Sequence, residues 1–203
     1  IRYANMRAIV CAEFSAIYAE CYARSGEEYL KNYAESYLAS SKRYAVKGGS
    51  ESGDAWYSEA LVSQSMAMIL MKRFDEARQI ASGKEMLLDQ PARIYAALYR
   101  EDGNQIDLES CRSELRGFSQ GLDRVLGSGP STDDIFYKFK ITLAVFSASK
   151  DPADLAVCNE ALTQLLKRKP RYHSDAARNL LAALLAEQGK VEDAVKTSFG
   201  NSW

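Results

Sequence analysis

The chain has 203 residues, of which 47% are hydrophobic and 26% charged, and its formal net charge is −1. This composition is typical of a soluble globular protein, and the balanced charge gives no reason to expect a nucleic-acid partner. No apolar run reaches the roughly 20 residues that a membrane-spanning helix needs, so we expect no membrane span. The first residue is Ile1 rather than Met, and we expect residues before it, which leaves a signal peptide or an upstream domain open.

Helix signals dominate along the whole chain. There are only four prolines, and no stretch alternates apolar and polar residues with the β-branched side chains of a strand. Turn-forming residues divide the chain into about ten helical segments, which pair into hairpins at roughly 1–47, 54–89, 90–126, 131–169 and 172–199. We therefore expect an all-α fold, with a single helical-repeat domain over residues 1–203.

The first hairpin, 1–47, is rich in tyrosine. Seven of the twelve tyrosines lie in the first 44 residues, and four of them recur at helical spacing within about 80° of one face: Tyr29, Tyr33, Tyr37 and Tyr44. Two interpretations remain open. The rings pack the hairpin with their hydroxyls reaching water, or they form an aromatic docking face for a partner protein or for a homodimer.

A short pattern occurs in both the second and the last hairpin. Met66–Ala81 reads MAMILMKRFDEARQIA, and Ala182–Lys196 reads AALLAEQGKVEDAVK. In each, an apolar stretch meets a polar turn, a large apolar residue follows, and an alanine comes three positions later (Ala77, Ala194). This layout suits two antiparallel helices packed closely around a short turn, which is the unit of a helical repeat protein.

Several helix starts and ends are marked by local sequence. Asp151-Pro152 predicts an N-cap followed by a first-turn proline, and Gln90-Pro91 is a weaker version of the same signal. Ser131 or Thr132 can cap the helix that begins DDIFYKF, whose two aspartates suit the positive end of the helix dipole. The basic residues 167–169 fit a helix end before Pro170.

The residues that catalysis or metal binding would need are scarce. His173 is the only histidine and precedes a helix start, so we interpret it as a solvated loop residue. No catalytic motif occurs, and the loop 127–132 lacks the lysine of a phosphate-binding loop. We interpret the basic run 167–171 as charge at a helix end, with contact to an acidic partner as the alternative. We expect no enzymatic activity, no cofactor and no metal.

The four cysteines are scattered, at positions 11, 21, 111 and 158. We interpret them as buried free thiols, with disulfide or metal roles as the alternatives. Free thiols and the lack of a glycosylation sequon favour a reducing, cytoplasmic environment.

The hairpins resemble tetratricopeptide (TPR) repeats. In the last hairpin Leu181, Leu185 and Val191 fall at the family's large positions, and Ala182 and Ala194 at its small ones. The resemblance implies an irregular TPR-like α–α superhelix that binds protein in a groove lined by the first helices. The groove-facing family positions map to Glu59, Val62, Met66 and Ile69, and to Asn179 and Ala183. Only Asn179 matches the family's carboxylate clamp, so we expect none.

We therefore expect a non-enzymatic protein–protein interaction module that binds a partner helix or peptide. Two alternatives remain. One is a regulatory or sensor segment of a longer protein, such as a transcription regulator. The other is an immunity-like or chaperone-like protein that masks one dedicated partner.

Overall fold

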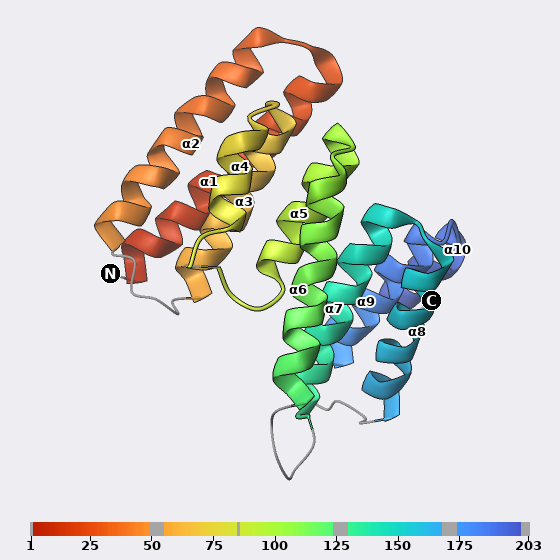
Figure 1. Cartoon of the computed structure of the whole chain (residues 1–203). Helices are drawn as coiled ribbons and strands as arrows, with labels where there is room; N and C mark the ends of the chain where they lie inside the picture. The colour runs from red at the N-terminus through yellow and green to blue at the C-terminus, as the bar shows by residue number, and fades with distance from the viewer. Residues whose placement is uncertain (1, 49–54, 85, 124–129, 168–173, 200–203) are drawn as a thin grey trace. The chain divides into compact units, whose positions relative to one another are not determined.

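The computed structural model describes residues 2–48, 55–84, 86–123, 130–167 and 174–199, and all regular elements in these ranges are α helices (Figure 1). Within them lie α1 (Arg2–Ser25), α2 (Glu28–Gly48), α3 (Ala55–Leu70), α4 (Phe74–Ala81), α5 (Gln90–Asp102), α6 (Gln105–Asp123), α7 (Thr132–Ser149), α8 (Pro152–Lys167), α9 (Ser174–Glu187) and α10 (Val191–Phe199). Consecutive helices pair in the five predicted hairpin ranges. The all-α fold of about five helix hairpins is therefore confirmed.

The chain forms two compact units, Ile1–Cys111 and Arg112–Trp203, and each is described by itself. The first unit holds α1 to α5 and the start of α6, and the second holds the rest of α6 and α7 to α10. Each has its own apolar core. Leu38 and Met68 are buried in the first core, and Phe139 and Leu184 in the second. The single domain over residues 1–203 stays a prediction.

The two hairpins that share a sequence pattern also share a turn. Lys72 between α3 and α4, and Gly189 between α9 and α10, both have a left-handed backbone, with φ of 62° and 77°. In each turn the next residue donates its N–H to a carbonyl five residues earlier, at 2.8 Å from Arg73 to Met68 and 2.9 Å from Lys190 to Leu185. The predicted alanines, Ala77 and Ala194, are both buried. The repeated pattern thus builds the same local structure twice.

The other three hairpins use a shorter turn of two residues. Its first residue is left-handed and is Gly26, Gly103 or Lys150. The N–H of that residue donates to the carbonyl four residues earlier at 2.8–2.9 Å, which satisfies one of the free carbonyls at the helix end. The array therefore contains two turn types rather than one repeated unit.

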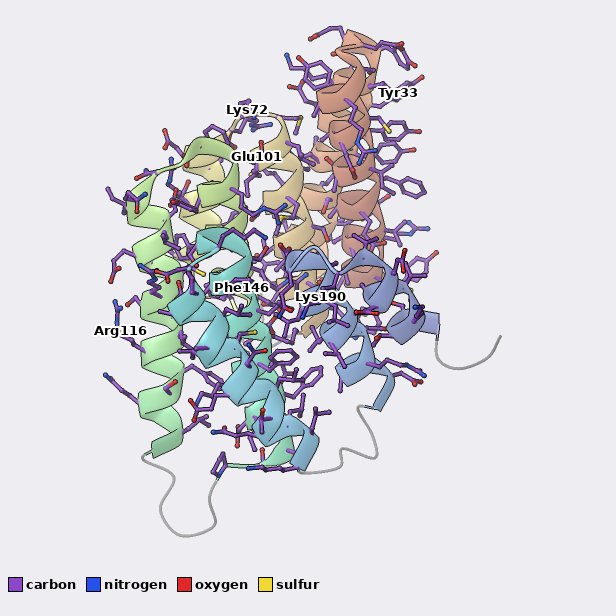
Figure 2. The ribbon with its side chains drawn as sticks, turned by 90° about the vertical axis from the view of Figure 1, so that its right-hand side faces the viewer. Tyr33, Lys72, Glu101, Arg116, Phe146 and Lys190 are labelled. Carbon is purple, nitrogen blue, oxygen red and sulfur yellow. The ribbon has the colours of Figure 1, made fainter. Side chains whose placement is uncertain are left out.

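Replacing Lys72 with Gly is expected to raise the free energy of unfolding by about 0.5–1 kcal/mol, because a left-handed backbone strains any residue with a Cβ. The exposed ion pair that is lost, from Lys72 Nζ to Glu101 Oε2 at 3.0 Å (Figure 2), contributes little. Lys42→Gly is the matched control. It also removes an exposed ion pair, but it puts glycine inside a helix and should cost about 1 kcal/mol. Urea unfolding of both variants checks the prediction, and a stability loss in Lys72→Gly would contradict it.

Two of the predicted helix caps are confirmed. Ser131 Oγ accepts the N–H of Asp134 at 3.1 Å, and Asp134 Oδ2 accepts the N–H of Ser131 at 2.8 Å, which is a capping box. Asp151 Oδ1 accepts the N–H of Ala153 at 2.8 Å, directly before the first turn of α8. Lys167 is the last described residue of that helix, and residues 168 and 169 lie outside the described residues.

The predicted cap at Gln90 is wrong by one residue. Gln90 is the first residue of α5, and Asp89 holds the N-cap position without a side-chain capping bond. The longer Gln90 side chain reaches back instead, and its Oε1 accepts the N–H of Leu87 at 2.9 Å.

Three ion pairs join the second helices of neighbouring hairpins. In each, a basic side chain of one second helix binds an acidic side chain at the third residue of the second helix in the next hairpin. The pairs are Lys42–Glu76 at 3.5 Å, Arg78–Asp107 at 2.7 Å and Arg112–Asp154 at 2.7 Å. An acidic residue in the first turn also faces the positive end of its own helix dipole. These contacts recur where the sequence repeat itself is hard to recognise.

The cysteines meet the expectation of buried free thiols only in part. All four are free, and Cys111 and Cys158 are buried. Cys21 is exposed near the end of α1 and Cys11 is half-buried, because their sides of the helix face away from the core. His173, residues 127–129 and residues 168–171 of the basic run lie outside the described residues, so the interpretations of them stay predictions.

Candidate functional site

Small residues line the seam between α1 and α2. Ser15 Oγ donates to the carbonyl of Ala34 at 2.7 Å, and Ser41 Oγ donates to the carbonyl of Ala8 at 2.7 Å. Gln64 of α3 joins this buried network, since its Nε2 donates to Ser41 Oγ at 2.8 Å. Hydroxyl bonds of this kind require the two backbones to lie close together, which alanine and serine allow. Most large side chains of α1 therefore lie on its other faces.

Five large apolar side chains of α1 form a continuous row on its outer face, which we call the α1 stripe. They lie within about 80° of one another around the helix axis. Each is between 44% and 65% exposed, and they are Tyr3, Met6, Val10, Phe14 and Ile17. Apart from Ile9, the buried side chains of α1 are small or polar, whereas the five large side chains of the stripe face water. This is the reverse of what folding alone favours, because burying large apolar side chains stabilises a fold most.

Aromatic side chains continue the α1 stripe onto α2. The ring of Phe14 stacks on Tyr37 at a centroid distance of 5.4 Å, and Tyr18 stacks on Tyr37 at 5.6 Å. Tyr18 also meets Tyr33 at 5.3 Å, and Tyr29 lies edge-on to Tyr33 at 6.3 Å. Tyr37 is half-buried in this packing, whereas Tyr29 and Tyr33 are more than half exposed. Figure 2 shows Tyr33 on the outer side of the first hairpin.

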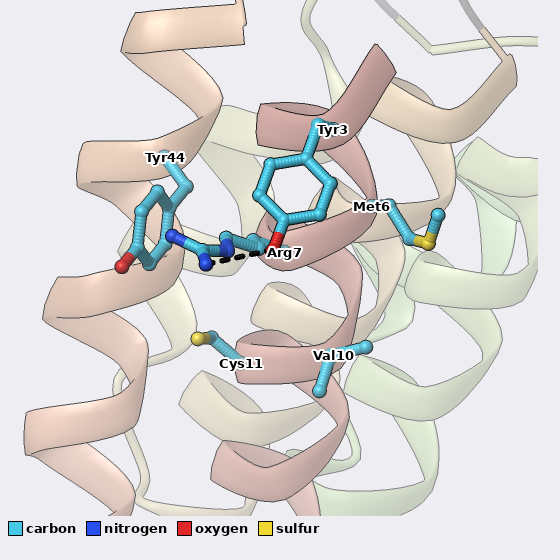
Figure 3. A pocket seen from close by; sticks show the side chains of 6 residues that line it. All are labelled: Tyr3, Met6, Arg7, Val10, Cys11 and Tyr44. Atoms are coloured by element: carbon cyan, nitrogen blue, oxygen red, sulfur yellow. Dashed lines mark hydrogen bonds between the residues drawn. The ribbon is translucent and has the colours of Figure 1, made fainter.

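Arg7 lies at the other end of this aromatic series. Its guanidinium lies 4.4 Å from the ring centre of Tyr3 and 5.6 Å from that of Tyr44, and it donates to the Tyr3 hydroxyl at 2.8 Å (Figure 3). An open hollow of about 260 Å³ lies here, lined by Tyr3, Met6, Arg7, Val10, Cys11 and Tyr44. Small-molecule pockets have volumes of roughly 300–1,000 Å³, so this hollow suits one side chain of a partner better than a ligand.

Cys11 in this hollow is a poor nucleophile. Burial raises the pKa of its thiol, and the nearby charge of Arg7 opposes that effect only in part. The thiol is therefore protonated at neutral pH, whereas reactive cysteines are thiolates with a lowered pKa.

The ten residues that the sequence suggested for partner binding differ in how exposed they are. Val62 and Ile69 are 2% exposed and belong to the core, so their groove assignment is corrected: α3 packs its groove-facing side inside the first unit. Met66 is half-buried against the same core, and Glu59 bonds to Gln90 and Arg93 of α5 at 3.3–3.4 Å. The exposed or half-exposed remainder is Tyr29, Tyr33, Tyr37 and Tyr44 on α2, and Asn179 and Ala183 on α9 of the other unit.

Among the described residues, no three His, Cys, Asp or Glu side chains gather as a metal site would require. In the same part of the chain, none of the helices combines the length and apolarity of a bilayer crossing.

Comparisons with known proteins do not assign the chain to a family. A scan against protein-family models, a search of curated proteins and a search of solved structures each found no match. The resemblance to TPR repeats therefore depends on the residues alone and stays a prediction.

Sequence reasoning found the tyrosines of α2 but missed the residues of α1 beside them. Met6, Val10, Phe14 and Ile17 are spaced three or four residues apart, which is a helical face. The sequence did contain a signal, because Ala8, Ala12 and Ala19 place small side chains on one face of α1 and the large side chains fall on another. Composition alone does not say which of two apolar faces is buried.

Proposed function

We propose that this protein is a non-enzymatic helical-repeat interaction module that docks a protein helix on its first hairpin. The observation that supports this most strongly is the α1 stripe, whose five large side chains are half exposed on one face. Contiguous exposed apolar surface of this kind marks interaction sites, because single chains otherwise bury it. Exposed Tyr29 and Tyr33 extend the surface with the residue type favoured at interface hot spots.

The spacing of the α1 stripe favours a helix as the docked element. Steps of three and four residues match the spacing of side chains on a second helix, as in helix–helix packing generally. From Tyr3 to Ile17 the stripe spans about 21 Å at 1.5 Å per residue, or four turns of a helix. A proline-rich extended peptide would need a slot between parallel rings. The rings of Tyr18 and Tyr37 stack directly on each other, which fills such a slot.

The TPR-like assignment remains part of this proposal, with docking moved from the groove to the first hairpin. Five helix pairs and the shared turn of the second and last hairpins support a repeat array. The four free cysteines support a reducing, cytoplasmic location. Because the net charge is −1, a protein partner is better supported than a nucleic acid.

Ile17→Lys tests the proposal, because it places a charge on the apolar docking face. Affinity capture with this variant should lose the partner that the unchanged protein retains, by about tenfold or more, because docking would bury the new charge without a partner. Ile106→Lys is the matched control, since Ile106 is 72% exposed on α6 and away from the first hairpin. Equal capture by all three proteins would contradict the proposal.

A further inference from the structure

The α1 stripe has the same spacing in both directions along the helix. Val10 is its middle residue, Met6 and Phe14 lie four residues to either side, and Tyr3 and Ile17 lie seven residues to either side. A two-fold axis through Val10 therefore brings an antiparallel second copy of α1 into register. Met6 then faces Phe14 of the second copy, and Tyr3 faces Ile17. Two-fold interfaces require this self-complementarity, whereas an unrelated partner does not.

The exposed apolar area is close to what a dimer needs. A large side chain offers roughly 150–250 Å² of surface, so the α1 stripe and Tyr33, each about half exposed, supply on the order of 600 Å² per copy. The neighbouring atoms of Arg7, Glu13 and Tyr44 add to this area. Specific interfaces bury about 600–1,000 Å² per partner, so the face reaches the lower end of that range.

We propose that the helix docked on the first hairpin is α1 of a second copy of this chain, packed antiparallel about a two-fold axis through Val10. The proposal rests on the docking face proposed above and names its occupant. Paired with α2 of each copy, the two α1 helices form a four-helix arrangement that covers the large side chains now facing water. The homodimer thus supplies the missing cover of α1.

Disulfide cross-linking between two single variants tests the occupant and its direction. In a background carrying Cys11→Ser and Cys21→Ser, which removes the thiols of α1, Tyr3→Cys and Ile17→Cys are prepared separately with tags of different length. The two proteins are mixed, oxidised mildly and separated by size without reductant. A disulfide needs Cα atoms within about 7 Å, so the mixed Tyr3→Cys/Ile17→Cys dimer should exceed either same-site dimer by about tenfold. Circular dichroism of each variant checks that it is folded.

The controls separate this proposal from the docking face itself. Val10→Cys, on the two-fold axis, should cross-link to itself, and Ile106→Cys should not. Dominant same-site dimers of the other variants, or no cross-link above the Ile106→Cys level, would overturn the antiparallel homodimer. If no cross-link forms but Ile17→Lys still abolishes capture of a different protein, the docking face stands and the second copy is excluded. If neither effect is seen, both proposals fail.

Discussion

Replacing Arg78 with Ala is expected to lower the free energy of unfolding by about 3–5 kcal/mol, because it leaves a buried carboxylate without its partner. Asp107 is only 1% exposed, and Arg78 donates to it from Nε at 3.1 Å and from Nη2 at 2.7 Å. The same guanidinium also pairs with Asp102 and Asp75, so it joins α4 to the turn between α5 and α6. Hydrogen bonding to Asp107 raises the pKa of Arg78, and the charge is therefore present at every working pH. Urea unfolding measures the loss.

Two further variants show whether the loss comes from the unpaired carboxylate. Arg178→Ala removes an arginine whose ion pair with Asp175 is exposed, and it should change stability little. The double variant Arg78→Met/Asp107→Leu removes the buried carboxylate together with its partly buried partner, and it should regain most of the stability lost in Arg78→Ala. A double variant as unstable as Arg78→Ala would show that the loss has another cause.

Phe139→Ala should cost about 3–5 kcal/mol, because Phe139 is fully buried in the core of the second unit and its removal leaves a cavity. Phe14→Ala is the matched control in the α1 stripe. Phe14 is 44% exposed and stacks on Tyr37, so its loss should cost about 1 kcal/mol. Thermal or urea unfolding at low protein concentration compares the two. Equal losses would contradict the distinction between core and docking face.

The helices and their caps could be predicted because their signals are local. The capping side chain of Ser131, the aspartate before Pro152 and the glycines of three turns each act within a few residues. The same locality explains the shared turn of the second and last hairpins, since its hydrogen bonds span no more than five residues. Lys150 was harder to predict because a lysine in a left-handed conformation carries no special sequence signal.

The candidate site could be predicted only in part, because burial is not local. Tyr29 and Tyr33 were found from their helical spacing, and that spacing is the same whether a face is buried or exposed. For the same reason Val62 and Ile69 could be placed on a groove although they lie in the core. The α1 stripe becomes visible only once Ala8 and Ser15 are known to face α2 and α3.

The ion pairs between the second helices of neighbouring hairpins also could not be predicted from local sequence. An acidic third residue in α4, α6 and α8 could be read from the chain, as Glu76, Asp107 and Asp154. Their partners Lys42, Arg78 and Arg112 lie 34, 29 and 42 residues earlier in the chain. No sequence rule selects these basic residues over their neighbours. The structure was needed to pair them.

The most direct test of the docking face is the free energy of unfolding of the double variant Val10→Gln/Ile17→Gln, measured at a concentration where the protein is monomeric. Both side chains already face water in the single chain, so the expected change is about 1 kcal/mol or less. A loss of about 3 kcal/mol or more, as expected for Phe139→Ala, would place the α1 stripe in the core of the fold and contradict its role in docking.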